Sequence, residues 1–267
     1  MNLAPFDISR ARILVSNDDG IHAPGLKVLE RIARKLSKDV WVVAPENEQS
    51  GASHSLTVRT PLRIRRVAPR RYAVNGTPTD CVLLGALQIL KDRKPDVVLS
   101  GINPGGNLAE DVGYSGTVAA AMEGVLIGCR AVALSQLAAP DGPLRWRTAE
   151  RFGAEIVRKL AAAPWPRDVF VNINFPDLPV AAVKGIEITR QGRRRLQERI
   201  TEAFDPYDRP YYWIGSPRQD RPSDEPTDIA ACSRGFVSVT PLHIDYTHAG
   251  MARSLKNVFA PRGKRRS

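Results

Sequence analysis

The sequence predicts an α/β protein: a Rossmann-like, mostly parallel sheet with helices on both faces, followed by a β-rich C-terminal arm. Short apolar runs alternate with helical stretches through the first two thirds of the 267 residues. These runs are apolar throughout, which is typical of parallel strands that helices cover on both faces. From Gly185 onward the alternation stops and the chain becomes strand-like and proline-rich, with no long helix expected.

The first strand–helix–strand unit is predicted within the first 45 residues. Residues 12–16 (RILVS) form a short apolar run that ends in a polar cluster, as a buried strand opening onto a loop does. Between 24 and 36 apolar residues recur at three- and four-residue steps, the period of a helix that covers one face of a sheet. Residues 40–44 (VWVVA) predict the second strand, stopped by Pro45, and the connection should be right-handed.

The same alternation predicts the next elements in order. They are a helix over 79–90, a strand over 96–100, a helix over 116–128, a strand over 131–135, a helix over 147–163 and a strand over 169–173. Thr148 is a candidate cap for the last of these helices, and Pro164 lies beyond its end.

Two stretches depart from this pattern. Residues 62–67 (LRIRRV) alternate apolar and basic side chains and precede 72–74, which predicts a hairpin with one solvated face. Beyond Gly185 the segments IEIT, RPYYWIG and FVSVT predict a β-rich excursion that packs on another subunit. We therefore divide the chain into a core at 1–184, a dependent β-rich oligomerisation arm at 185–250 and a C-terminal segment with a basic tail at 251–267.

Composition narrows the class of protein. The chain carries 39 Lys and Arg against 28 Asp and Glu, a formal net charge of +11, which raises the hypothesis of a nucleic-acid or polyanion-binding protein. The basic residues are scattered, and no aromatic–basic interleaving marks a single-strand platform, so no stable nucleic-acid partner is expected. The basic run at 262–267 (RGKRRS) could touch a polyanion or be a solvated tail.

The cellular setting follows from cysteines and hydropathy. Three cysteines form no CxxC pair, which fits a reducing compartment and argues against a structural zinc site. The first residues lack the apolar core of a secretory signal, and no stretch of about eighteen uninterrupted apolar residues exists for a membrane span. A cytoplasmic protein with no membrane partner is the expectation.

Oxygen-rich loops follow the predicted strands, where ligands bind in open α/β sheets. Asp18 and Asp19 follow the first strand; an Asx turn would also explain them, but adjacent acids that face one site are usually relieved by a cation. The second loop supplies the hydroxyl of Ser50 and the third the amide of Asn103. Asn107-Leu108 stands where a P-loop needs Lys and Ser/Thr, and no GxGxxG fingerprint is present.

A fourth polar group precedes the alanine-rich helix. Ser115, Gly116 and Thr117 offer backbone amides and hydroxyls that suit phosphate, although a Ser/Thr helix cap explains them as well. Taken together the loops supply hard oxygen ligands, which favours Mg²⁺ or Mn²⁺ over zinc. His22 and His54 lie near the first two loops and are candidates for outer-shell groups or proton carriers, or for simple structural histidines.

Five ordered motifs resemble a known family, SurE, the survival-protein 5'/3'-nucleotidases. The motifs are SNDDGIHAPG at 16–25, SGAS at 50–53, NGTPTDCV at 75–82, SGIN at 100–103 and YSGTVAAAMEG at 114–124. The resemblance implies a Rossmann-like, metal-dependent phosphomonoesterase of nucleoside 5'- and 3'-monophosphates, with short polyphosphate as a further substrate. It also implies a β arm that mediates oligomerisation, giving a homodimer or homotetramer.

The resemblance also implies roles for individual residues. Asp18, Asp19, Ser50 and Asn103 would bind one divalent cation per subunit, with Asp18 and Asp19 catalytic. Asn107 and the segment Ser115, Gly116, Thr117 would face the substrate phosphate. The chain departs from the family in about ten residues before its first strand, in Glu46 and Glu48 of the second loop, and in its basic end.

These residues predict metal-assisted attack of water on phosphorus. A covalent aspartyl-phosphate route ranks lower, because it usually needs a D-x-D arrangement and Asp18 and Asp19 are adjacent. The sequence does not identify an acid for the leaving group.

Overall fold

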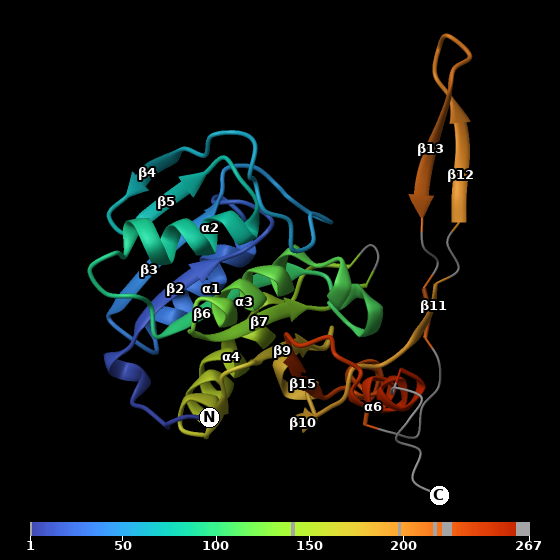
Figure 1. The fold of residues 1–267 in the computed structure, drawn as a ribbon. Coiled ribbons are helices and arrows are strands. Elements are labelled where there is room, and N and C mark those ends of the chain that lie inside the picture. The colour runs from blue at the N-terminus through green and yellow to red at the C-terminus, as the bar shows by residue number, and fades with distance from the viewer. Residues whose placement is uncertain (1, 140–141, 197–198, 216–217, 221–225, 260–267) are drawn as a thin grey trace, which may run out of the picture.

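A nine-stranded sheet organises the computed structural model, which describes residues 2–139, 142–196, 199–215, 218–220 and 226–259 (Figure 1). Its strands are β2 (Arg12–Ser16), β3 (Asp39–Pro45), β4 (Ile64–Ala68), β5 (Arg71–Val74), β6 (Val97–Pro104), β7 (Arg130–Gln136), β9 (Val169–Phe175), β10 (Ile186–Ile188) and β15 (Val237–His243). They lie in the order β10-β15-β9-β7-β6-β2-β3-β5-β4.

The sheet is mostly parallel, as predicted. The central pairs β2–β3, β2–β6, β6–β7 and β7–β9 are all parallel, and the antiparallel pairs are β4–β5 and β15–β9 toward the two edges. Ile13, Leu14 and Val15 of β2 are all fully buried. Consecutive residues of a strand point to opposite faces, so burial of all three requires a layer on each face.

Four helices supply those two layers: α1 (Pro24–Arg34), α2 (Pro78–Leu84), α3 (Gly116–Leu126) and α4 (Trp146–Ala161). The cluster on one face joins Ile13 to α1 and α4, and the cluster on the other joins Leu14 to α2 and α3. Helices on both faces are therefore confirmed. The predicted helix over 79–90 changes its hydrogen-bond pattern after Leu84 and continues as a π-helical turn, η2 (Gly85–Ile89).

Two details of the helix predictions are wrong. Thr148 does not cap α4, which begins at Trp146; its hydroxyl donates instead to the carbonyl oxygen of Leu178 at 2.6 Å. A ten-residue helix, α6 (Ala249–Val258), follows β15 where none was expected. Its first turn is capped by Nδ1 of His248, which accepts from the amide of Met251 at 2.9 Å, and histidine is not among the preferred caps that signal a helix start.

The segment after Gly185 contributes both to the sheet and to a projection. β10 and β15 are sheet strands, and α5 (Asp228–Ser233) precedes β15. The described residues 194–196, 199–215 and 218–220, here called the arm, extend away from the sheet (Figure 1). The arm consists of β11 (Arg194–Leu196), β12 (Arg199–Phe204), β13 (Pro210–Gly215) and β14 (Arg218–Asp220), paired as β11–β14 and β12–β13.

Short elements complete the described chain. They are β1 (Asn2–Leu3), which pairs with β8 (Trp165–Pro166), and the 3₁₀ turns η1 (Ile8–Arg10), η3 (Ala109–Gly113) and η4 (Val180–Ala182). The basic run at 262–267 lies outside the described residues. Within the described part of the chain, every helix is too short or too polar to cross a membrane.

Candidate active site

A cavity of about 710 Å³ lies where the loops after β2, β3 and β6 meet the start of α3. The carboxyl ends of parallel strands share one edge of the sheet, which is why loops distant in sequence meet there. Five of the predicted site residues line this cavity: Asp18, Ser50, Asn103, Asn107 and Ser115. Asp19, Gly116 and Thr117 adjoin them in sequence.

Asp18 is held in place from the start of α3. Its side chain is buried, and its Oδ1 accepts a 2.5 Å hydrogen bond from the hydroxyl of Thr117. Burial raises the pKa of Asp18, and the hydrogen bonds from Thr117 oppose that rise because they favour the charged carboxylate. Thr117 thus acts on the acid itself, a contact between residues 99 positions apart that the sequence did not indicate.

Gly116 lets the helix start approach the acid. A Cβ placed on Gly116 would lie 2.8 Å from the Cβ and 3.0 Å from Oδ2 of Asp18. Contacts below 3.0 Å between such atoms are sterically forbidden, so glycine is required here by close approach.

Asp19 carries a carboxylate oxygen without a partner. Burial, the neighbouring Asp18 and then Glu48 raise the pKa of Asp19 to about 7. Its Oδ2 is buried and accepts no hydrogen bond, and the same holds for Oδ1 of Asn17. Two crowded carboxylates with an unpaired buried oxygen are the environment that a divalent cation stabilises, so the residues present fit the predicted metal.

Ser50 and Asn103 present neutral oxygens to the same cavity. The hydroxyl of Ser50 donates to Oε1 of Glu48 at 2.8 Å, and Nδ2 of Asn103 donates to the carbonyl oxygen of Gly105 at 2.8 Å. Each hydrogen bond uses a donor and leaves oxygen lone pairs for a ligand. Among the described residues no group of three or more His, Cys, Asp and Glu side chains is arranged to hold a metal. The candidate set therefore depends on neutral oxygens beside two carboxylates.

The hydroxyls before α3 already have partners within the protein. Oγ of Ser115 accepts from the amide of Val118 at 3.1 Å and caps the helix, while the Thr117 hydroxyl is bound to Asp18. The helix-cap alternative thus holds for Ser115. The hydroxyl hydrogen of Ser115, which that bond does not use, and the first backbone amides of the helix remain as donors for an anion.

Asn107 is fixed in the wall of the cavity. Its side chain donates to the hydroxyl of Ser135 at 2.8 Å, and its backbone amide donates to Oδ1 of Asn174 at 2.9 Å. Its carbonyl oxygen accepts from the side chains of Asn172 and Asn174. This asparagine cluster holds the glycine-rich loop after β6 on the neighbouring strands.

Other residues line the cavity that sequence reasoning did not select: Asp111, Tyr114, Ile200 and Ile214. Ile200 and Ile214 belong to the arm, and no local motif places them near residue 18. Glu48, noted only as an unusual acid of the second loop, raises the pKa of both Asp18 and Asp19. Glu46 is instead paired with Arg65 at 2.6 Å.

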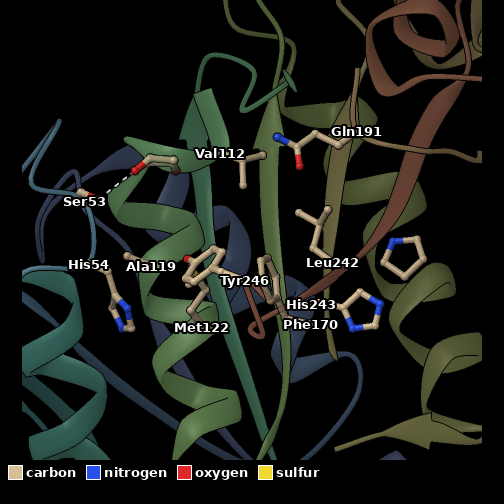
Figure 2. Close-up of a pocket in the computed structure, with 13 residues that line it drawn as sticks. Ser53, His54, Val112, Ala119, Met122, Phe170, Gln191, Leu242, His243 and Tyr246 are labelled. Carbon is tan, nitrogen blue, oxygen red and sulfur yellow. Dashed lines mark hydrogen bonds between the residues drawn. The ribbon is translucent and has the colours of Figure 1, made fainter. Parts of the chain in front are cut away.

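A second cavity of about 360 Å³ lies beside the first, along α3 (Figure 2). Ser115 lines both cavities. His54 lines this second one and lies 3.0 Å, Nε2 to Oε2, from Glu123 of α3. His22 is exposed. Neither histidine lines the cavity that holds Asp18.

Comparison with known proteins identifies relatives of this chain. Residues 13–198 match the family described as survival protein SurE. The chain is 58% identical over 253 residues to the 5'-nucleotidase SurE of Paramagnetospirillum magneticum, covering 95% of this chain and 97% of that protein. It is 54% identical to the 5'-nucleotidase SurE of Parvibaculum lavamentivorans, covering 93% and 91%.

A solved structure agrees with the fold. The crystal structure of the SurE protein from Aquifex aeolicus superimposes with a TM-score of 0.81 at 42% identity, covering 92% of this chain and 98% of that one. The doubly wound sheet and the acidic cavity at its strand ends define an α/β enzyme whose site lies among the strand-end loops. The chain belongs to the SurE family, and the resemblance seen in its motifs is confirmed.

Proposed function

We propose that the protein is a divalent-metal-dependent 5'-nucleotidase that hydrolyses nucleoside 5'-monophosphates to nucleoside and phosphate. The observation that carries this proposal is the adjacent acid pair at the strand ends: Asp18 is buried and lines a cavity with neutral oxygens, and half-buried Asp19 has an unpaired, buried carboxylate oxygen. The names of relatives at 54–58% identity support the phosphomonoesterase class and the 5' ester.

Asp18, Asp19, Ser50 and Asn103 would hold one Mg²⁺ or Mn²⁺ ion. When bound, such a cation polarises a phosphoryl oxygen and lowers the pKa of water, which makes hydrolysis accessible near neutral pH. The donor set supports a hard cation because it consists of carboxylate, hydroxyl and amide oxygens.

Residues of the chain would perform the other steps of hydrolysis. Thr117 donates to Oδ1 of Asp18 and thereby holds that acid in one orientation. One of the two carboxylates accepts the proton of the attacking water. The first amides of α3, at Gly116 and Thr117, face the substrate phosphate and offset the negative charge that grows on its oxygens in the transition state. Asn107, which lines the same cavity, also faces this phosphate.

Hydrolysis of 3'-monophosphates and of short polyphosphate extends the same proposal. The cavity of about 710 Å³ is large compared with a phosphate group, so the ester can enter with the nucleoside in more than one orientation. The net charge of +11 supports the attraction of such anionic substrates.

Substitution of Asp18 by Asn tests the proposal. It keeps the shape of the side chain and removes its charge, so we expect phosphate release from AMP with Mn²⁺ or Mg²⁺ to fall at least about 100-fold. Asp168→Asn, at an exposed acid away from the cavity, is the matched control and should keep full turnover. Treatment with a chelator should abolish wild-type turnover, and re-addition of the cation should restore it. Near-full activity of Asp18→Asn would contradict the assignment of Asp18 as a ligand of the cation.

The alternative from another class is a nucleic-acid or polyanion-binding protein. It is favoured only by the net charge, and many arginines are already paired with carboxylates, as Arg12 is with Asp39 at 2.8 Å and Arg71 with Glu30 at 2.6 Å. Tight binding of duplex DNA at about 0.15 M salt, without phosphate release from any monophosphate, would favour nucleic-acid binding over the nucleotidase function.

We also infer a homodimer or homotetramer, with the catalytic core at 1–184, the arm region at 185–250 as its contact and a C-terminal segment at 251–267. Exposed aromatic side chains of the arm, Tyr211 and Trp213, support self-association. A cytoplasmic location is part of the proposal; three free, buried cysteines support a reducing compartment.

A further inference from the structure

The arm brings an apolar pair of side chains to the cavity that holds Asp18. Ile200 of β12 and Ile214 of β13 stand opposite each other in the hairpin register, and both line this cavity. Their side chains are 63% and 83% exposed, so they are not part of the protein core. The cavity therefore combines oxygen ligands with an apolar wall supplied by a distant segment.

The root of the arm is tied to the segment that carries the site. Arg194 forms an ion pair with Asp111, and the two side chains are only 8% and 14% exposed. The backbone amide of Arg194 also donates to Oε2 of Glu110 at 2.7 Å. Glu110 and Asp111 belong to η3, which leads directly into Ser115, and Asp111 itself lines the cavity. These contacts fix the apolar wall beside the site.

We propose that Ile200 and Ile214, together with Tyr114, form the nucleoside subsite of the enzyme. A nucleoside monophosphate has one highly charged end, and the base at its other end presents flat faces that stack on apolar and aromatic side chains. The charged end matches the acid pair with its cation and the amides of α3, and the nucleoside matches two aliphatic side chains and an exposed aromatic ring. This inference rests on the proposed nucleotidase function and adds which residues of this chain contact the leaving group.

The second cavity is the competing location for the nucleoside. It too combines apolar and polar walls, including Tyr246 and Leu242 (Figure 2). It is lined by none of the four residues assigned to the cation, however, whereas Ile200 and Ile214 share a cavity with Asp18, Ser50 and Asn103. A monoester whose phosphate reaches the acids can contact the arm pair without leaving that cavity.

The experiment compares a double variant, Ile200→Ala with Ile214→Ala, against wild type. We expect KM for AMP to rise about 5- to 20-fold, because two aliphatic side chains that contact the nucleoside are shortened. The kcat should change less than about 2-fold, and the inhibition constant of inorganic phosphate, which has no nucleoside, should stay unchanged. Both residues are exposed, so the variant should fold as wild type does.

Two controls make the result specific. Phe204→Ala removes an equally exposed apolar side chain of the same strand that does not line the cavity, and it should leave KM unchanged. Tyr246→Ala alters the second cavity and should also leave KM unchanged. Unchanged KM in the double variant, an equal rise in the phosphate inhibition constant, or a KM effect confined to Tyr246→Ala would each overturn the inference. A wild-type protein that releases no phosphate from AMP contradicts the proposed function instead, and the inference falls with it.

Discussion

At the scale of single residues, the site depends on how closely the start of α3 approaches Asp18. The hydroxyl of Thr117 donates a hydrogen bond to Asp18, and Gly116 has no side chain that would collide with it. A cation site needs its carboxylates in one orientation, because small displacements of a ligand reduce affinity and rate. The motif from Ser115 to Thr117 therefore holds Asp18 in place, in addition to the phosphate contact that we propose for it.

Substitution of Gly116 by Ala should damage the site although alanine is the better helix former. The added Cβ would lie 2.8 Å from Cβ of Asp18, so the acid must move. We expect kcat/KM for AMP to fall about 10- to 100-fold and the free energy of unfolding to fall by about 1–3 kcal/mol.

Gly113→Ala is the matched control for this prediction. Nothing lies within 4 Å of a Cβ placed on Gly113, so activity and stability should stay near wild type. Equal behaviour of the two variants in AMP hydrolysis and urea denaturation would show that close approach at Gly116 is unimportant.

At the scale of elements, Asp228 joins η3, the chain before the arm, and α5. Its carboxylate is fully buried and accepts from the amides of Ala109 at 2.9 Å, Gly192 at 2.8 Å and Ile229 at 2.8 Å. Burial raises the pKa of Asp228, and these three backbone hydrogen bonds oppose that rise. One side chain thereby satisfies donors from three segments that share no secondary structure.

Asp228→Ala should therefore destabilise the protein more than an ordinary cap substitution. Two or three buried amides would lose their acceptor, and we expect a loss of about 3 kcal/mol in the free energy of unfolding. Thr227→Ala, which removes only the cap of α5, should cost about 1 kcal/mol. Urea denaturation of both variants measures the difference, and equal losses would contradict the role given to Asp228.

At the scale of the whole molecule, the arm has two different faces. Successive residues of β13 point to opposite sides, so Ile214 and Tyr212 share one face while Tyr211 and Trp213 share the other. The hydrogen bond from Tyr212 to Glu202 at 2.9 Å confirms that these two residues lie on the same side of the hairpin. A two-stranded hairpin is marginally stable by itself in water, which favours an arm that packs on a second copy.

The face with Tyr211 and Trp213 is thus available for self-association. We expect wild-type protein to sediment at two or four times the monomer mass, and the double variant Tyr211→Ser with Trp213→Ser to associate at least about 10-fold more weakly, because two aromatic contacts are lost. Val58→Ser, at an apolar residue outside the arm that is more exposed than either aromatic, should sediment as wild type. A monomeric wild-type protein at micromolar concentration would contradict the oligomer.

Much of the fold could be predicted from local sequence alone. Continuous apolar runs such as 40–44 and the helical period over 24–36 depend on neighbouring residues, and the structure has a strand and a helix there. The cap of α6 by His248 and the hydrogen bond from the Thr148 hydroxyl to Leu178 were missed, because both are side-chain contacts that composition does not encode.

The sequence by itself determined the α/β class, the mostly parallel sheet and the acid pair after the first strand. Each of these follows from patterns of residues that are close together in the sequence. Only the tertiary structure decided what surrounds that pair. Thr117 reaches Asp18 across 99 positions, and Ile200 and Ile214 enter the same cavity from the arm. Contacts between segments so distant in sequence depend on packing of the complete fold, which no local pattern specifies.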